Sequence, residues 1–149
     1  MTIGLDTNVL VYAANSGDVA RRTIAKEVVR RATLADAILT LQSLAEFVRV
    51  MTGKIRMPHA DVQRFIDAWR RNFRVKAADE HAFEDAMLAV AEHGLPIFDA
   101  LLWATARHAG CTTILSEDFQ DGRSLGGVTF LNPFDPKNAR RLDRLLPVR

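Results

Sequence analysis

The sequence predicts an α/β fold in which a central, mostly parallel β-sheet carries helices on both faces. Short apolar runs alternate with longer segments whose apolar residues recur at helical spacing, which is the pattern of a parallel sheet with crossover helices. The chain has 149 residues, of which 48% are hydrophobic and one is cysteine. A chain of this length buries about 68–70% of its unfolded surface. We therefore expect residues 1–149 to form a single domain without disulfide or zinc support.

The first half of the chain contains three predicted strands and three predicted helices. They are a strand at 2–5, a helix at 19–32, a strand at 37–40, a helix at about 42–52 that ends near Gly53, a helix from Pro58 and a weak strand at 74–77. Proline suits the first turn of a helix, which places the third helix start at Pro58. The apolar stripe of this third helix consists of Val62, Phe65, Ile66, Trp69 and Phe73.

The second half continues the alternation. Asp79 is predicted to cap a helix that stops at Gly94. The apolar stripe of this helix, which we expect to face the core, consists of Phe83, Met87, Val90 and Ala91. The remaining elements are a helix at about 99–109, strands at 112–115 and 128–131, and a polar tail from about residue 135 in which Leu142, Leu145 and Leu146 dock a last turn.

Four acidic residues fall where a parallel sheet brings them to one edge. Asp6 and Asp118 come just after strands, whereas Asp99 begins a helix and Glu46 lies within one. Ligands of open α/β sheets bind beyond the carboxyl ends of the strands. Four carboxylates gathered there would raise one another's pKa, and a divalent cation relieves that repulsion. The residues alone therefore predict an acidic pocket and a candidate metal site, whose bound waters could attack a phosphodiester.

Each acid also has a purely structural interpretation. Asp99 precedes Ala-Leu-Leu-Trp and would serve as a helix N-cap, and Asp118 lies in a segment typical of turns. Glu46 would be a solvated helical residue. Asp6 is the hardest to explain in this way, because a carboxylate between two apolar runs needs a partner or a metal.

Four segments that contain these acids follow one another in a recognisable order. They are Gly4-Leu5-Asp6-Thr7-Asn8-Val9-Leu10-Val11-Tyr12, Ala45-Glu46-Phe47, Phe98-Asp99-Ala100 with Ala104-Thr105-Ala106, and Leu115-Ser116-Glu117-Asp118-Phe119-Gln120-Asp121-Gly122. Their order and gaps resemble the motifs of the PIN-domain family, and within it the VapC-like ribonuclease toxins of prokaryotic type II toxin–antitoxin pairs. The resemblance extends from about residue 2 to residue 131.

The resemblance implies a PIN-like fold and a function. It makes the chain a metal-dependent endoribonuclease that hydrolyses RNA as the toxin of a toxin–antitoxin pair, with Mg²⁺ as cofactor and Mn²⁺ as a substitute. Its partners would be RNA, a cognate antitoxin protein and a second copy of the chain. The catalytic, metal-binding acids would be Asp6, Glu46, Asp99 and Asp118. Asn8 and Ser116 would support them, as would Asp121, for which turn chemistry before Gly122 is the simpler explanation.

RNA binding would depend on basic residues, of which the sequence offers three clusters. They are Arg22, Lys26 and Arg30; Arg49, Lys54 and Arg56; and Arg70, Arg71, Arg74 and Lys76. We expect at least one cluster to line the RNA path, although each also suits a solvated helix face. The net charge of +2 does not by itself predict a nucleic-acid partner. Trp103 could stack on a base, but a core position is the more usual role.

Cysteine content and hydropathy suggest the cellular setting. Cys111 is the only cysteine, so a disulfide within the chain is excluded and a cytoplasmic location is expected. We expect Cys111 itself to be a small core residue. No apolar run reaches the length of about 20 residues that a membrane helix needs, and no membrane partner is expected. The four histidines lack the spacing of a zinc site.

Other functions remain open from the sequence. A phosphatase of the haloacid-dehalogenase type needs a second Asp where this chain has Asn8, and a receiver domain needs an acidic pair that is missing here. A catalytically silent PIN-like module that binds RNA or protein is an alternative, although all four acids are present. A DNA-directed nuclease of similar fold is another, since metal chemistry at phosphate does not itself distinguish RNA from DNA.

Overall fold

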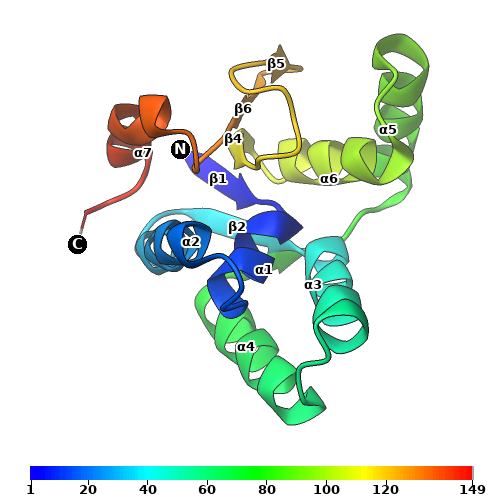
Figure 1. Cartoon of the computed structure of the whole chain (residues 1–149). Coiled ribbons are helices and arrows are strands. Elements are labelled where there is room, and N and C mark those ends of the chain that lie inside the picture. Colours follow the sequence, from blue (N-terminus) through cyan, green and yellow to red (C-terminus); the bar gives the residue numbers. More distant parts are fainter. Residues whose placement is uncertain (149) are drawn as a thin grey trace.

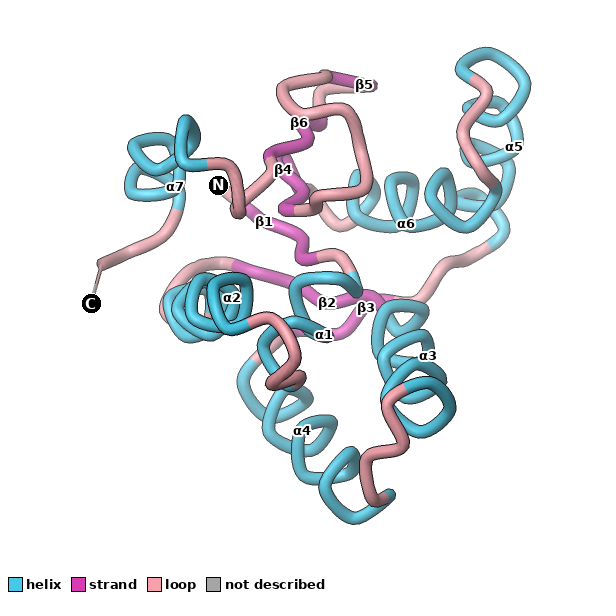
Figure 2. Tube along the Cα trace, viewed as in Figure 1, coloured by secondary structure: helices cyan, strands magenta, loops and turns pink. Residues whose placement is uncertain are grey.

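A six-stranded sheet organises residues 1–148, the part of the chain that this computed structural model describes (Figures 1 and 2). The strands are β1 (Thr2–Leu5), β2 (Ala37–Thr40), β3 (Arg74–Lys76), β4 (Cys111–Leu115), β5 (Ser124–Leu125) and β6 (Val128–Leu131). Their order across the sheet is β3-β2-β1-β4-β6-β5, and every pair is parallel except β5 with β6. Residue 149 lies outside the described residues, and the single-domain interpretation of 1–149 stays a prediction.

Seven α-helices in residues 1–148 connect and cover these strands. They are α1 (Thr7–Ala14), α2 (Val19–Ala32), α3 (Leu41–Arg49), α4 (His59–Asn72), α5 (Glu80–His93), α6 (Ile97–His108) and α7 (Ala139–Leu145). A π-helical turn (Val50–Lys54) extends α3, and a 3₁₀ turn (Pro136–Asn138) precedes α7. No helix among the described residues is both long enough and apolar enough to cross a membrane.

Two apolar cores lie on opposite faces of the sheet, because neighbouring residues of a strand point to opposite sides. Ile3, Leu5 and Leu39 belong to one core, which α1, α2, α3, α4 and α7 complete. Ile38 and Ile114 belong to the other core, which α5 and α6 complete. The predicted α/β architecture, with a mostly parallel sheet between two helical layers, is confirmed.

The strand order places the chain's topological switch point between β1 and β4. From β1 the chain proceeds to β2 and β3 on one side, and its later strands β4 and β6 lie on the other. In open α/β sheets, the crevice outside the carboxyl ends of the strands at such a point is the usual ligand site. Asp6 directly follows β1 and Ser116 directly follows β4, so the predicted site residues begin at this crevice.

One helix was not predicted from the sequence, and two helix boundaries differ from the prediction. The apolar run after Asp6 forms the additional helix, α1. The helix expected at about 42–52 ends at Arg49 and continues as a π-helical turn to Lys54. The helix expected from Asp99 begins at Ile97, so Asp99 lies in its first turn and is not its N-cap. Apolar periodicity does not resolve these ends because capping is decided by local hydrogen bonds.

The apolar stripe predicted for α5 is only partly correct. Val90 packs against the core, but Phe83 and Met87 are 51% and 48% exposed, and the buried face consists of Ala82, Ala86 and Ala89. Small residues let two helices approach closely, and α5 packs along α6 through this alanine face. The larger side chains are consequently left on the outside of the molecule.

Tertiary structure also defines the last part of the chain. Leu142 and Leu146 are buried, which confirms that the tail docks on the domain. The buried guanidinium of Arg31 holds it there by donating to the carbonyl oxygens of Leu146 and Pro147, at 2.5 and 2.9 Å. Beside it, β5 and β6 form an antiparallel hairpin that the sequence prediction did not include.

Candidate active site at the carboxyl edge of the sheet

Asp6 occupies the centre of the candidate site and is also the N-cap of α1. Its Oδ1 accepts a hydrogen bond from the backbone N–H of Thr7 at 2.7 Å, while its Oδ2 accepts one from the Ser116 hydroxyl at 2.7 Å. The residue is only 6% exposed. A charge so placed is costly, and burial raises the pKa of Asp6 to about 6 against the lowering effect of these two hydrogen bonds.

Ser116 and Asn8 connect Asp6 to Asp118. The Ser116 hydroxyl accepts a hydrogen bond from the backbone N–H of Asp118 at 3.0 Å while it donates to Asp6. Asn8 Nδ2 donates to Ser116 Oγ and to Asp118 Oδ2, both at 3.1 Å. The ends of β1 and β4 are thus joined by a polar network, and Asn8 and Ser116 lie where the sequence predicted supporting residues.

Glu46 reaches the same edge from α3. Its Oε2 accepts a hydrogen bond from the Thr7 hydroxyl at 3.0 Å, and its Oε1 accepts one from Gln42 Nε2 at 3.0 Å. Gln42 also donates to the backbone carbonyl of Phe98, one residue before Asp99, at 3.0 Å. Thr7 and Gln42 were not predicted as site residues. Gln42 precedes Glu46 by one helical turn, so spacing on the helix was a usable signal.

Asp99 completes the acidic group from the first turn of α6. Burial raises its pKa, and the nearby carboxylates of Asp118 and Glu46 raise it further. Asp118 and Asp99 also contribute to the raised pKa of Asp6, after its burial. The four predicted acids therefore lie close enough to interact through their charges, although they come from four different elements of the fold.

The residues present fit a hard divalent cation. The donors are all oxygens, the charge is strongly negative, and the side-chain oxygen Oδ1 of Asn8 is buried without a hydrogen-bond partner in the described residues. Among residues 1–148, no three His, Cys, Asp or Glu side chains are arranged as a ready-made metal cluster.

Two hollows lie on either side of Glu46, and residues of one of the three basic clusters line them. The first has a volume of about 410 Å³ and is lined by Asn8, Glu46, Lys54 and Asp118 among others. The second, of about 360 Å³, is lined in part by Glu46, Arg49 and Phe98. Lys54 stands at the end of the π-helical turn. Among residues 1–148, the cluster Arg49, Lys54 and Arg56 is therefore the one that borders these hollows, through Arg49 and Lys54 but not through Arg56.

A second polar group forms the far wall of the larger hollow. The Tyr12 hydroxyl donates to Glu117 Oε1 at 2.5 Å, and Arg21 Nε donates to Glu117 Oε2 at 3.0 Å. The hydrogen bond to Glu117, together with burial, raises the pKa of Tyr12 to about 12, so the phenol keeps its proton. This group attaches the residue before Asp118 to both α1 and α2 and thereby fixes the loop that carries Asp118.

Two candidate residues are placed away from this site. The Asp121 carboxylate accepts hydrogen bonds from the backbone N–H of Asn132 and from the Asn138 side chain, so it connects its loop to the C-terminal segment. Trp103 is 6% exposed and its indole N–H donates to the carbonyl of Leu125, which makes it a core residue and excludes base stacking. Cys111 is buried, as expected.

Three solved structures similar to this chain are described as a toxin or as toxin–antitoxin complexes. Mycobacterium tuberculosis VapC20, a sarcin-ricin loop cleaving toxin, is 22% identical with a TM-score of 0.63, covering 78% of this chain and 91% of its own. A toxin–antitoxin complex from Klebsiella pneumoniae is 18% identical with a TM-score of 0.63, covering 88% and 97%. VapBC2 from Rickettsia felis, bound to a DNA fragment from its promoter, is 16% identical with a TM-score of 0.59, covering 87% and 97%. These likenesses establish a shared fold.

Sequence comparison supplies the family. A comparison with curated proteins finds no match. The family profile described as PIN domain matches residues 3–120, a segment that includes all four acids together with Asn8 and Ser116, but not Asp121. The chain therefore belongs to the PIN domain family.

Proposed function

We propose that this chain is a metal-dependent endoribonuclease that acts as the toxin of a toxin–antitoxin pair. The observation that carries the proposal is the convergence of Asp6, Glu46, Asp99 and Asp118 at the switch point of a PIN fold. The likeness to a toxin that cleaves an RNA loop supports RNA as the substrate.

Mg²⁺, or Mn²⁺ in its place, is the proposed cofactor, held by these four acids. When bound, such an ion supplies an activated water and neutralises charge that develops on the phosphate. Ser116 and the Thr7 N–H hold the Asp6 carboxylate in place, while Gln42 and the Thr7 hydroxyl hold that of Glu46. Residues that hydrogen-bond to metal-binding side chains in this way fix the orientation of those side chains. Lys54 and Arg49, on the two sides of Glu46, are the proposed phosphate contacts of the RNA.

The proposed protein partners are an antitoxin and a second copy of this chain. Two of the similar structures are toxin–antitoxin complexes, which supports the first. The exposed face of α5, formed by Phe83, Met87 and Leu88, supports the second, since a monomer rarely leaves large apolar side chains together in water. Light scattering on Met87→Glu should show a smaller mass than wild type if this face joins two copies, and an unchanged mass would remove it from the interface.

The proposal is tested by comparing wild type, Asp99→Asn and Asp67→Asn on total RNA and on single-stranded DNA. Each protein is assayed with Mg²⁺, with Mn²⁺ and with a chelator. Asp67 lies on α4 outside the acidic group, so its variant controls for the loss of one negative charge. We expect discrete RNA cleavage that requires metal and falls by more than about 100-fold in Asp99→Asn alone, because even the partners of metal ligands typically contribute 10–100-fold.

Three outcomes would redirect the proposal. Cleavage of DNA in place of RNA would assign a DNA-directed nuclease of the same fold. Binding of RNA or of a protein partner without cleavage, by folded protein free of inhibitor, would assign a silent binding module. Cleavage by Asp99→Asn at the wild-type rate would exclude the site itself.

A further inference from the structure

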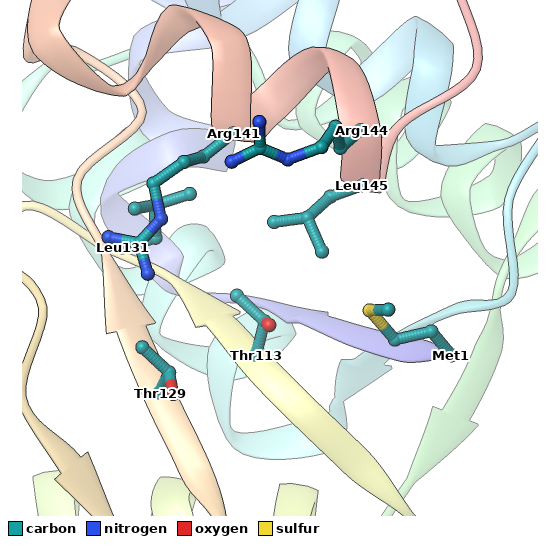
Figure 3. Close-up of a pocket in the computed structure, with 7 residues that line it drawn as sticks. All are labelled: Met1, Thr113, Thr129, Leu131, Arg141, Arg144 and Leu145. Atoms are coloured by element: carbon teal, nitrogen blue, oxygen red, sulfur yellow. The ribbon is translucent and has the colours of Figure 1, made fainter.

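A separate cavity lies on the face of the sheet beneath α7, away from the acidic group. It has a volume of about 250 Å³. Thr113, Thr129 and Leu131 of β4 and β6 form its floor, and Arg141, Arg144 and Leu145 of α7 form its wall, with Met1 at one end (Figure 3). In the described part of the chain, it shares no lining residue with the two hollows beside Glu46.

The charge of this cavity is positive. Within residues 1–148, neither Arg141 nor Arg144 makes an ion pair or a side-chain hydrogen bond, and no acidic residue lines the space. The acid on the same helix, Asp143, pairs instead with Arg31 at 3.1 Å. Figure 3 shows Arg141 extending from α7 toward the strand floor. Two arginines that line a cavity without a carboxylate suit a phosphate, because each presents several N–H donors to the anion.

A threonine hydroxyl adds a polar group to the floor of the cavity. Thr113 lines the cavity, and its hydroxyl is not among the buried side-chain atoms of residues 1–148 that lack a partner, so it is accessible from the cavity. The neighbouring Thr129 hydroxyl pairs instead with Ser124 at 2.7 Å. The Thr113 hydroxyl can therefore donate to an oxygen of a bound ligand.

We propose that this cavity is a nucleotide-binding site that takes a phosphate between Arg141 and Arg144. Its other side is apolar, with Leu131, Leu145 and the Met1 side chain, and suits the ribose or the face of a base. The cavity, of about 250 Å³, is smaller than the roughly 300–1,000 Å³ of pockets that enclose a drug-sized molecule. It would hold the phosphate and part of the rest of one nucleotide, either free or as one unit of an RNA strand. The inference does not depend on the proposed nuclease activity.

The test is a binding titration of the full chain in the presence of a chelator, with three probes. They are the four nucleoside 5′-monophosphates, the matching nucleosides, and a hydroxyl-terminated single-stranded oligoribonucleotide. The variants are Arg141→Gln and Arg144→Gln, and the matched control is Arg140→Gln, which removes the same charge from the same helix but does not line the cavity. Amide chemical shifts of Thr113 and Thr7 report whether a probe occupies this cavity or the acidic site.

We expect nucleotides to bind with shifts at Thr113 and not at Thr7. Binding should weaken about tenfold in each of Arg141→Gln and Arg144→Gln, as loss of a charge-assisted hydrogen bond implies, and less than about twofold in Arg140→Gln. Binding by mononucleotides would identify a free nucleotide as the ligand, and binding by the oligoribonucleotide alone would identify an RNA strand. The proposal is overturned if no probe binds, if nucleosides bind as well as nucleotides, or if Arg140→Gln weakens binding as much as the other two variants.

Discussion

Replacing Asp6 with Asn is predicted to make the metal-free fold more stable relative to wild type as the pH rises, while it abolishes the proposed activity. Burial, with smaller contributions from Asp118 and Asp99, raises the pKa of Asp6 from 3.8 to about 6. Ionising this carboxyl group in the folded chain therefore costs about 3 kcal/mol more than in the unfolded chain. Asparagine carries no charge and caps α1 as well as aspartate does, but its NH2 group cannot accept the hydrogen bond from Ser116, a loss that is the same at every pH.

The sign of the pH dependence follows from the raised pKa. Between pH 3.8 and about 6, the folded chain holds a proton on Asp6 that the unfolded chain has released. The stability of the wild type consequently falls as the pH rises through this window, and that of Asp6→Asn does not. Between pH 4.5 and pH 8, the free energy of unfolding of the variant should rise relative to that of wild type by about 2 kcal/mol. For a domain of this size, that change corresponds to a shift of about 4–8 °C in the difference between the two melting temperatures.

Thermal unfolding followed by circular dichroism at both pH values, with a chelator present, measures these differences. Asp67→Asn on the surface of α4 is the control for net charge. If Asp67→Asn changed the stability in the same way as Asp6→Asn, the buried charge of Asp6 would not be the cause. The same conclusion would follow if the stability of Asp6→Asn relative to wild type did not increase with pH. Adding Mg²⁺ should increase the stability of wild type relative to Asp6→Asn, because an ion that binds only the folded wild-type chain stabilises it by mass action.

Two further substitutions test the packing around the fold. Arg31→Met should lower the free energy of unfolding by about 2–3 kcal/mol and accelerate amide hydrogen exchange in α7, because the buried guanidinium donates to the carbonyl oxygen of Leu146. Unchanged hydrogen exchange in α7 would show that Arg31 does not anchor this helix. Gly126→Ala should lower the free energy of unfolding, measured by urea denaturation, by about 1–3 kcal/mol. This loss should be larger than the loss caused by Gly127→Ala. Both glycines have positive φ, but a Cβ at 126 would lie 2.9 Å from Trp103 whereas one at 127 would meet nothing within 4 Å, so equal losses would refute the steric explanation.

Local sequence was sufficient for every strand except β5, and for the position of two of the candidate acids at the edge of the sheet. The strands at 2–5, 37–40 and 128–131 and the helix at 19–32 agree with the structure, because each is a run whose period matches its element. Asp6 and Asp118 follow strands of a parallel sheet, and this position alone assigns them to one edge. Periodicity was not sufficient for α5, where the alanine face and the larger apolar face have the same spacing.

The sequence by itself determined the fold class, the order of the elements and the acids that meet at the switch point, since these depend on apolar periodicity and on residue type. Only the tertiary structure decided which basic cluster borders Glu46, that Asp121 supports the C-terminal segment, and that Thr7 and Gln42 hold the Glu46 carboxylate. These outcomes depend on contacts between segments far apart in the chain, and such contacts are decided by how helices pack on the sheet and not by any local pattern.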